Sequence, residues 1–518
     1  MSNVSNRKID EERILAESAA SPEDPMSVTS AAREQEAIPD DEGAIKAGRL
    51  AGKSMSQAIW ILSMPVLLQQ TMAAGVGFVD KLVAGNMPAD AARAAMDGVG
   101  IGSFIGWFIG IAMTGLGVGG QVIIARGMGS GDLRESQRAL GQSMTLSFIW
   151  GLLVAVLMMV LAEPLAQYAH LSPEGTRDCV TYVRTLAYGI PFCGVMMVGA
   201  MCMHGSGDAH KPFQIAVWVN IVNALLTWLI SGVDLHAWGS TIANPWVHDP
   251  HRWGVFGIAA GSSISYLVGA WLTWHALRKG VRDLRLDTSE LRYDRGMTWR
   301  IVRVGVPNFV EGLAMWTVNL LVLGFIGQAA ENGIGTTAKE GLVGAHIITV
   351  QWESFSFLPG FAMGTAAGAL AGQYLGAGNI RLAREAIWRC TLIGIAIMGT
   401  MGVCFILFGH ALTKIISDDP VHLELVPKCL VASGCIQVFF ALAMVVRNGL
   451  RGVGDTKWIL GITVFGCYAI RLPLAWYLGI HLGYGLVGIW WGLMLELAVR
   501  GLMFLARFRY GAWEKITV

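Results

Sequence analysis

The 518-residue sequence is 54% hydrophobic and 14% charged, and its formal net charge is +1. A soluble globular protein has about 25% charged residues, so this composition excludes a soluble chain with an ordinary polar surface. The near-neutral charge, with no basic stripe of interleaved aromatic residues, also argues against nucleic-acid binding. We therefore expect an all-α polytopic membrane protein whose surroundings are the lipid bilayer.

Residues 1–53 are rich in charged side chains and contain no apolar stretch. A signal peptide would need a short apolar core near the N-terminus, so the segment is not predicted to be one. Low hydrophobicity combined with many charges is typical of disorder. We predict a disordered cytoplasmic tail at 1–53.

Twelve apolar runs follow, and each is long enough to cross a bilayer, which takes about 20 helical residues. The basic stretch from Leu277 to Arg303 is too densely charged to lie in hydrocarbon, so we predict a linker at 278–299. The predicted transmembrane helices are 57–80, 100–122, 139–161, 180–203, 212–232, 254–277, 300–327, 343–371, 387–409, 426–449, 459–480 and 484–507.

The distribution of Lys and Arg predicts the orientation in the membrane, because these residues are enriched in cytoplasmic loops. With the N-terminus inside, the inner loops and their flanks hold 18 such residues and the outer loops hold 8. We therefore predict a multi-pass protein of the plasma (inner) membrane with both termini in the cytoplasm.

Two glycine turns of the predicted inner loops recur in the second half of the chain. The turn Gly129–Asp132 reappears as Gly376–Asn379, and Gly205–Asp208 reappears as Gly452–Asp455, both 247 residues later. Six spans per copy place the two copies parallel in the membrane, an arrangement known from secondary transporters. We predict two six-helix bundles related by a pseudo-two-fold axis, at 54–277 and 300–510.

Two further motifs resemble nucleotide-binding and metal-binding sites but do not predict them. Gly115–Gly120 matches GxGxxG, but it ends an apolar span and follows no predicted strand. The predicted outer loop 233–253 has three histidines and Asp249, but their spacing fits no recognised metal site. We predict no metal site, and we find no nucleophile–base constellation that an embedded enzyme would need.

Ionisable residues inside spans are rare and are candidate functional groups. A carboxylate in a dry cavity can trade its charge against a proton or a cation, which is the chemistry of ion-coupled transport. Asp80 ends the first span, where it is either such a group or an ordinary interfacial residue. The other candidates are Glu311, His346, Glu353, Arg471 and Glu496.

Three further features concern helix faces. Arg471 keeps its proton, so we expect it to be a structural partner of a carboxylate. Asn223 and Thr227 are four residues apart and share one face of the fifth span, where they line a cavity or join neighbouring helices. His346 and Glu353 are two turns apart on one face of the eighth span.

Several of these segments resemble the multidrug and toxic compound extrusion (MATE) family. The similarity covers most of residues 57–507, and no single motif decides it. The segments that carry it are Pro65 with Gly77–Asp80 and Gly85, Ala125–Asp132, Gly205–Pro212, Glu353–Gly360, Gly372–Gly378 and Leu450–Thr456.

The resemblance implies two six-helix bundles around a central cavity that opens to alternate sides. It also implies an antiporter that exports cationic, lipophilic compounds in exchange for H⁺ or Na⁺, with no other cofactor. Asp80 matches the family's first-helix aspartate and Asn223 its fifth-helix asparagine, whereas Thr227 stands where some members have a second aspartate.

The chain also departs from the family at acidic positions of the seventh and tenth helices, where it has Thr317 and Phe440. These departures leave Asp80, Asn223 and Thr227 as candidates for cation or proton coupling. Glu311, His346 and Glu353 are the candidates for an acidic second-lobe cavity that attracts cations. The alternative substrate is a lipid-linked precursor or an endogenous metabolite, although such flippases would need several Arg inside spans. A channel fits the duplicated halves poorly.

Overall fold

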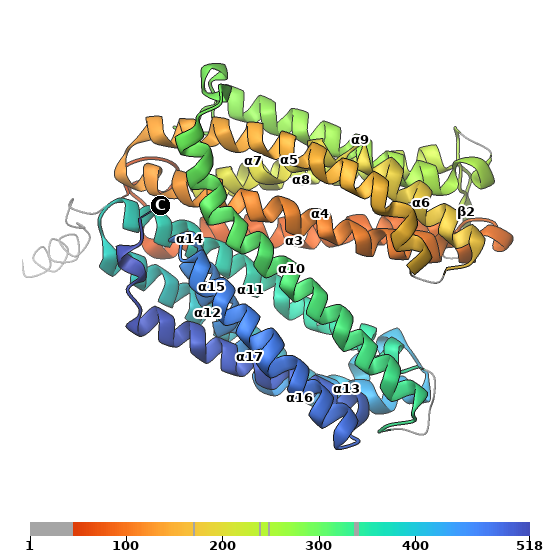
Figure 1. Ribbon diagram of the computed structural model, residues 1–518. Coiled ribbons are helices and arrows are strands. Elements are labelled where there is room, and N and C mark those ends of the chain that lie inside the picture. The colour runs from red at the N-terminus through yellow and green to blue at the C-terminus, as the bar shows by residue number, and fades with distance from the viewer. Residues whose placement is uncertain (1–44, 169–170, 238–239, 247–248, 336–340, 518) are drawn as a thin grey trace, which may run out of the picture. The chain divides into compact units, whose positions relative to one another are not determined.

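The computed structural model describes residues 45–168, 171–237, 240–246, 249–335 and 341–517. The predicted tail therefore lies largely outside the described residues. Figure 1 shows the helices as two bundles. We call the first bundle, from α3 to α9, the N-lobe, and the second, from α10 to α17, the C-lobe.

The N-lobe consists of long helices and one small hairpin. The strands β1 and β2 pair antiparallel with Leu235 opposite Ile242. Its elements are α3 (Met55–Gly85), α4 (Ala89–Ser130), α5 (Leu133–Tyr168), α6 (Pro173–Ala187), α7 (Ile190–Gly205), α8 (His210–Ser231), β1 (Leu235–Ala237), β2 (Ser240–Ile242) and α9 (Pro250–Lys279).

The C-lobe repeats this plan, but three of its segments widen into π-helical turns, labelled η3 to η5. Its elements are α10 (Arg295–Glu331), α11 (Leu342–Gly376), α12 (Ile380–Ile416), α13 (Pro420–Ala441), η3 (Leu442–Val446), α14 (Arg447–Gly452), α15 (Thr456–Val464), η4 (Phe465–Arg471), α16 (Leu472–Trp476), η5 (Tyr477–His481) and α17 (Gly485–Tyr510). The short 3-10 helices η2 (Thr288–Leu291) and η6 (Trp513–Lys515) precede and follow the C-lobe.

The twelve predicted spans are confirmed. Among the described residues, ten helices or continuous helical runs are long and apolar enough to cross a membrane, and the pair α6–α7, bent by 57°, makes an eleventh. The helix α3 has 31 residues, and at 1.5 Å per residue it reaches about 46 Å, enough for the twelfth span.

The repeated glycine turns have a common backbone geometry. Gly131 and Gly378 have φ angles of 82° each, and Gly207 and Gly454 have φ angles of 86° and 90°. These left-handed values disfavour residues with a Cβ atom. The spacing of 247 residues that the sequence shows therefore reflects two equivalent pairs of helix ends.

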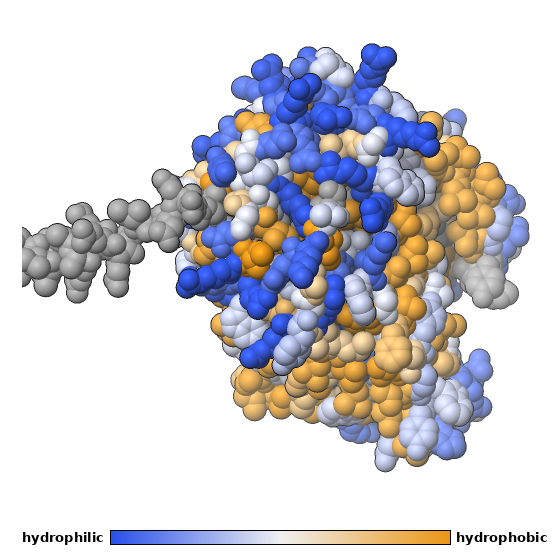
Figure 2. Space-filling view, turned by 60° about the vertical axis from the view of Figure 1, so that its left-hand side comes forward, coloured by the Kyte–Doolittle hydropathy of each residue, from blue (hydrophilic) through white to orange (hydrophobic). Residues whose placement is uncertain are grey.

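The end of the molecule that carries these turns also carries the connection between the lobes, residues 280–294. We call it the linker end, and the end with β1 and β2 the hairpin end; Figure 1 shows them at the left and the right. Figure 2 brings the linker end forward and shows hydrophilic residues over it and hydrophobic residues along the helix flanks. This distribution fits helices whose sides face lipid.

One part of the tail prediction is wrong, because residues 45–53 are packed. Leu50 is buried in a cluster with residues of α11, α12 and α17. The Arg49 guanidinium lies 3.4 Å from the Asp208 carboxylate, and the Gly48 amide donates to Asp283. Composition predicted disorder for the whole tail, but contacts of Gly48, Arg49 and Leu50 hold this short segment against the linker end.

The helix α3 belongs to two cores. Ala58, Ile59, Leu62 and Val66, in its first half, pack with residues of the C-lobe. Val83 and Ala84, near its end, pack with α4, α5 and α6. The predicted division into bundles at 54–277 and 300–510 thus separates the chain into halves but not into two independent cores.

Candidate functional site

A cavity of about 730 Å³ lies within the N-lobe. Its lining comes from α3, α4, α6, α7, α8 and α9, and it is mostly apolar. We call it the N-lobe cavity. Its polar and aromatic lining includes Gln69, Gln70, Asp80, Lys81, Ser103, Trp107, Tyr182, Asn220, Ser262, Tyr266 and Thr273.

Asp80, on the last two turns of α3, lines this cavity and is buried. Its Oδ2 accepts hydrogen bonds from the Tyr182 hydroxyl at 3.0 Å and from the Ser262 hydroxyl at 3.4 Å. Its Oδ1 has no hydrogen-bond partner among the described residues. Asp80 is therefore a carboxyl group with one oxygen held and one oxygen available.

The predicted partners of Asp80 lie in the same hydrogen-bond network. Asn223 Nδ2 donates to Ser262 Oγ at 2.9 Å and to Thr227 Oγ1 at 3.4 Å. Thr227 in turn donates to the Ile258 carbonyl oxygen at 3.5 Å. Ser262 therefore connects Asn223 to Asp80, and neither Ser262 nor Tyr182 is among the site residues predicted from the sequence. Both are polar side chains of otherwise apolar spans.

Glu311 of α10 has a different environment. One of its oxygens lies 2.6 Å from Arg451 Nη2, and the other accepts from Arg447 at 3.2 Å and from Thr463 at 3.0 Å. The two guanidinium groups outnumber this buried carboxylate. Both arginines are among the 18 Lys and Arg of the predicted inner loops and their flanks, although their side chains reach back into the bundle.

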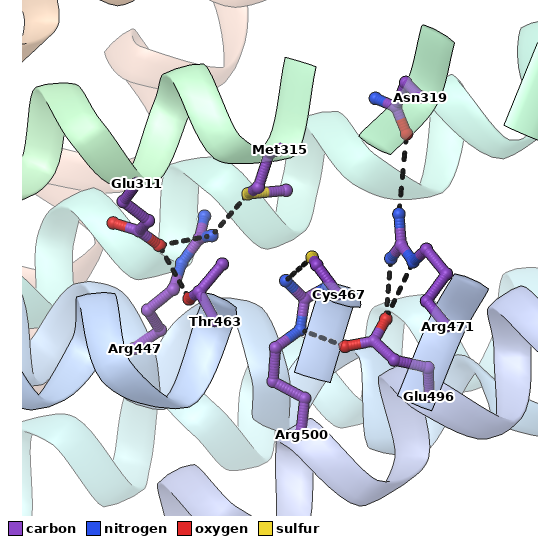
Figure 3. A network of polar contacts seen from close by, with 9 residues as sticks. All are labelled: Glu311, Met315, Asn319, Arg447, Thr463, Cys467, Arg471, Glu496 and Arg500. Atoms are coloured by element: carbon purple, nitrogen blue, oxygen red, sulfur yellow. Dashed lines mark hydrogen bonds and ion pairs between the residues drawn. The ribbon is translucent and has the colours of Figure 1, made fainter. Parts of the chain in front are cut away.

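In a second cluster, too, two arginines face one buried carboxylate (Figure 3). Glu496, fully buried, faces Arg471 Nη2 at 2.7 Å and Arg500 Nε at 3.0 Å. Arg471 Nη1 also lies 3.5 Å from Asn319 Oδ1. Arg471 is thus the carboxylate partner that the sequence predicts, and Glu496 is that carboxylate.

The remaining second-lobe candidates do not join Glu311. The Glu353 carboxylate accepts a hydrogen bond from Ser433 at 3.2 Å, and the His346 ring packs 5.6 Å from that of Trp490. Across the two clusters of the preceding paragraphs, four arginines face two carboxylates. The side chains around Glu311 therefore do not form the acidic cavity that the sequence predicts, because guanidinium groups surround this carboxylate.

The lobes contact one another at the linker end. Arg126 of α4 donates to the Val453 carbonyl oxygen at 2.7 Å, and Gln373 of α11 donates to the Gly205 carbonyl oxygen at 2.8 Å. A Cβ atom on Gly129 would lie 1.8 Å from the Gln373 carbonyl oxygen. The repeated turns therefore close this end by direct backbone approach.

The histidine-containing loop gives no support for a metal site. Within the described ranges, no group of three His, Cys, Asp or Glu side chains is placed to hold a metal ion. The His236 ring is hydrogen-bonded to the Thr241 hydroxyl at 2.9 Å, and residue 248 lies outside the described residues.

Comparison with known proteins agrees with this architecture. The sequence model of the MatE family matches residues 65–229 and 308–477, one segment in each lobe. The chain is 24% identical over 458 residues to a probable multidrug resistance protein NorM of Thermotoga maritima, covering 88% of this chain and 93% of that protein. It is also 24% identical over 459 residues to the multidrug resistance protein PmpM of Pseudomonas aeruginosa, covering 87% and 90%.

A solved structure has the same fold. It is the outward-facing conformation of a multidrug resistance MATE family transporter, with a TM-score of 0.77 and 20% sequence identity. The alignment covers 91% of this chain and 100% of that one. The likeness supports the arrangement of twelve helices in two bundles.

Proposed function

Because the chain belongs to the MatE family, we propose that it is a secondary active exporter of small molecules that exchanges them for H⁺ or Na⁺. Relatives that share about a quarter of its residues are named multidrug resistance proteins, which supports multidrug efflux. The coupling ion would bind in the N-lobe cavity.

The observation that carries the proposal is the contrast between Asp80 and the carboxylates of the two arginine clusters. Glu311 and Glu496 are each held by two arginines. Asp80 faces a cavity, forms no ion pair among the described residues, and keeps one oxygen without a partner. Such a carboxyl group can bind a proton or a sodium ion, whereas a carboxylate neutralised by arginine has no need of one.

Ion binding at Asp80 would bias alternating access only if its affinity differs between the two states. The network through Ser262 and Asn223 joins α3 to α8 and α9, so the charge of Asp80 acts on the packing of three helices. The contacts at the linker end must break for the cavity to open on that side.

For the substrate class, we propose lipophilic cations, which fit the lining of the N-lobe cavity. The N-lobe cavity combines a carboxylate with the rings of Trp107, Tyr182 and Tyr266, and aromatic faces attract cations. These features favour lipophilic cations. The distribution of Lys and Arg supports a cytoplasmic linker end, and with the protein in the plasma (inner) membrane, as we propose, export would proceed toward the hairpin end.

The test is export from vesicles under imposed pH and sodium gradients, applied separately. Asp80→Asn should abolish ion-driven efflux, because the amide cannot change its charge, while the protein remains inserted. Asp97→Asn is the matched control, since Asp97 is an exposed carboxylate on α4. Efflux by Asp80→Asn at the rate of the control would overturn the proposal.

The alternative substrate, a lipid-linked precursor or endogenous metabolite, gains one supporting observation. Flippases of phosphate-bearing lipids would need several arginines inside spans, and Arg447, Arg451 and Arg500 join Arg471 in this respect. Saturable, gradient-dependent movement of a pyrophosphate lipid, with no efflux of cationic dyes, would favour this alternative.

A further inference from the structure

A second cavity, of about 210 Å³, lies between the two lobes. We call it the interface cavity. It shares Gln69, Gln70, Met197 and Ala200 with the N-lobe cavity, so the two spaces adjoin. Its other polar lining consists of Thr114, Gln121, His204, Thr365, Asn448 and Arg451.

Buried polar atoms of the interface cavity lack hydrogen-bond partners among the described residues. Asn448 is only 8% exposed, and its Nδ2 has no hydrogen-bond partner among the described residues. The same holds for Arg451 Nε and for Nε2 of His204, a residue that is 7% exposed. A buried polar atom without a partner costs about 1–3 kcal/mol, so three of them around one cavity need an explanation.

The orientation of Asn448 is fixed by its other amide atom. Its Oδ1 accepts a hydrogen bond from Arg451 Nη1 at 3.0 Å, which leaves the amino group as the free end. A Cβ atom on Gly364, another lining residue, would lie 2.6 Å from Asn448 Nδ2. The amino group of Asn448 therefore lies against Gly364, where a larger residue would displace it.

The charge at the cavity is positive. Arg447 and Arg451 share the single carboxylate of Glu311, which leaves one guanidinium charge without an opposite charge in this cluster. The Arg447 and Arg451 side chains are only 14% and 15% exposed, and a charge largely removed from water is unfavourable unless it is paired. Water could satisfy the free donors, but only an anion would also balance the charge.

We propose that the interface cavity binds the carboxylate group of an exported compound, through Arg451 and the amino group of Asn448. The inference rests on the proposed export function and narrows its substrate class to cationic compounds that also carry an acidic group on their apolar body. Phe361 lines the same cavity and offers an apolar surface to that body. Asp80 lies in the other cavity, so the ion and the acidic group do not compete for one site.

The test measures binding separately from transport. The full chain in nanodiscs of zwitterionic lipid is titrated with benzoate, benzamide or benzylammonium at constant chloride, and the thermal unfolding midpoint is followed. Ligand that binds the folded state raises the midpoint in a saturable manner. Benzoate should raise the midpoint and the neutral benzamide should not, whereas any rise with benzylammonium would come from the N-lobe cavity and should persist in the variants below.

Three variants locate the site. Arg451→Gln should weaken benzoate binding about 10- to 100-fold, the range for a lost hydrogen bond to a charged group. Asn448→Ala removes one donor without changing the charge, and Gly364→Ala adds a Cβ atom to the cavity wall. Both should also weaken benzoate binding, and they test the site even if Arg451→Gln does not fold. Arg389→Gln, at an exposed pair with Glu385, is the charge-matched control.

Three results would overturn the inference: equal stabilisation by benzamide, unchanged benzoate affinity in the variants that fold, or the same saturable effect from chloride alone. Asp80→Asn separates this inference from the proposed function. It should bind benzoate as the wild type does although it no longer exports, and efflux by Asp80→Asn would refute the coupling role without touching the carboxylate site.

Discussion

Replacing Glu496 by Gln removes the carboxylate that Arg471 and Arg500 share in the second cluster and keeps the shape of the side chain. Glu496 is fully buried, and the two guanidinium groups contact its two oxygens at 2.7 and 3.0 Å. Removing one partner of a buried ion pair costs about 3–5 kcal/mol, because the remaining charge is left without compensation. We expect Glu496→Gln to lie in this range, a large part of a typical folding free energy of about 5–15 kcal/mol.

The assay is equilibrium unfolding by SDS in mixed micelles, followed by tryptophan fluorescence. Glu424→Gln is the matched control, because Glu424 pairs at 3.0 Å with Lys428 on the protein surface, and exposed pairs contribute about 0–1 kcal/mol. Replacing the whole cluster by Leu at 496 and Met at 471 and 500 should recover most of the loss. A Glu496→Gln protein as stable as the Glu424→Gln protein would refute the reasoning.

Two further changes act at the linker end. Gly129→Ala should disfavour the closed linker end, because its Cβ would lie 1.8 Å from the Gln373 carbonyl oxygen; spin-label distances across that end should broaden, whereas Gly461→Ala, with nothing within 4 Å, should leave them unchanged. Asp294→Ala should destabilise the protein by about 1 kcal/mol in thermal unfolding, the usual value of a lost helix N-cap, since Asp294 accepts from the amides of Gly296 and Met297. These amides and Arg138 hold the pKa of Asp294 below its ordinary value, so its contribution is complete at neutral pH and is lost as the pH falls below about 4. A difference between Asp294→Ala and wild type that grows toward pH 3 would contradict this sign.

The spans and the repeated turns could be predicted because their signals are local. A run of apolar residues is long enough to cross a bilayer or it is not, and a left-handed turn selects glycine wherever it occurs. The network around Asp80 could be predicted only in part. Ser262 is 182 residues from Asp80 in the chain, and a serine in an apolar span carries no signal of its own.

The arginines of the C-lobe show a different limit. Arg447 and Arg451 lie close to a glycine turn, so counting charges assigns them to a loop. The helix α14 continues through both residues, and their long side chains reach Glu311, which is more than 130 residues away in sequence. The charge in the interior of the C-lobe therefore depends on the direction in which these side chains point, and the amino-acid composition does not contain that information.

The two cores shared by α3 have a consequence for synthesis. This helix is the first of the predicted spans in the chain, yet Ile59 and Leu62 belong to one core cluster with residues as late as Phe504 and Trp513. In water, such a waiting apolar face would invite aggregation. In a bilayer, lipid tails cover it as well as other side chains do. The membrane thus allows the earliest helix to be among the last to find all its neighbours.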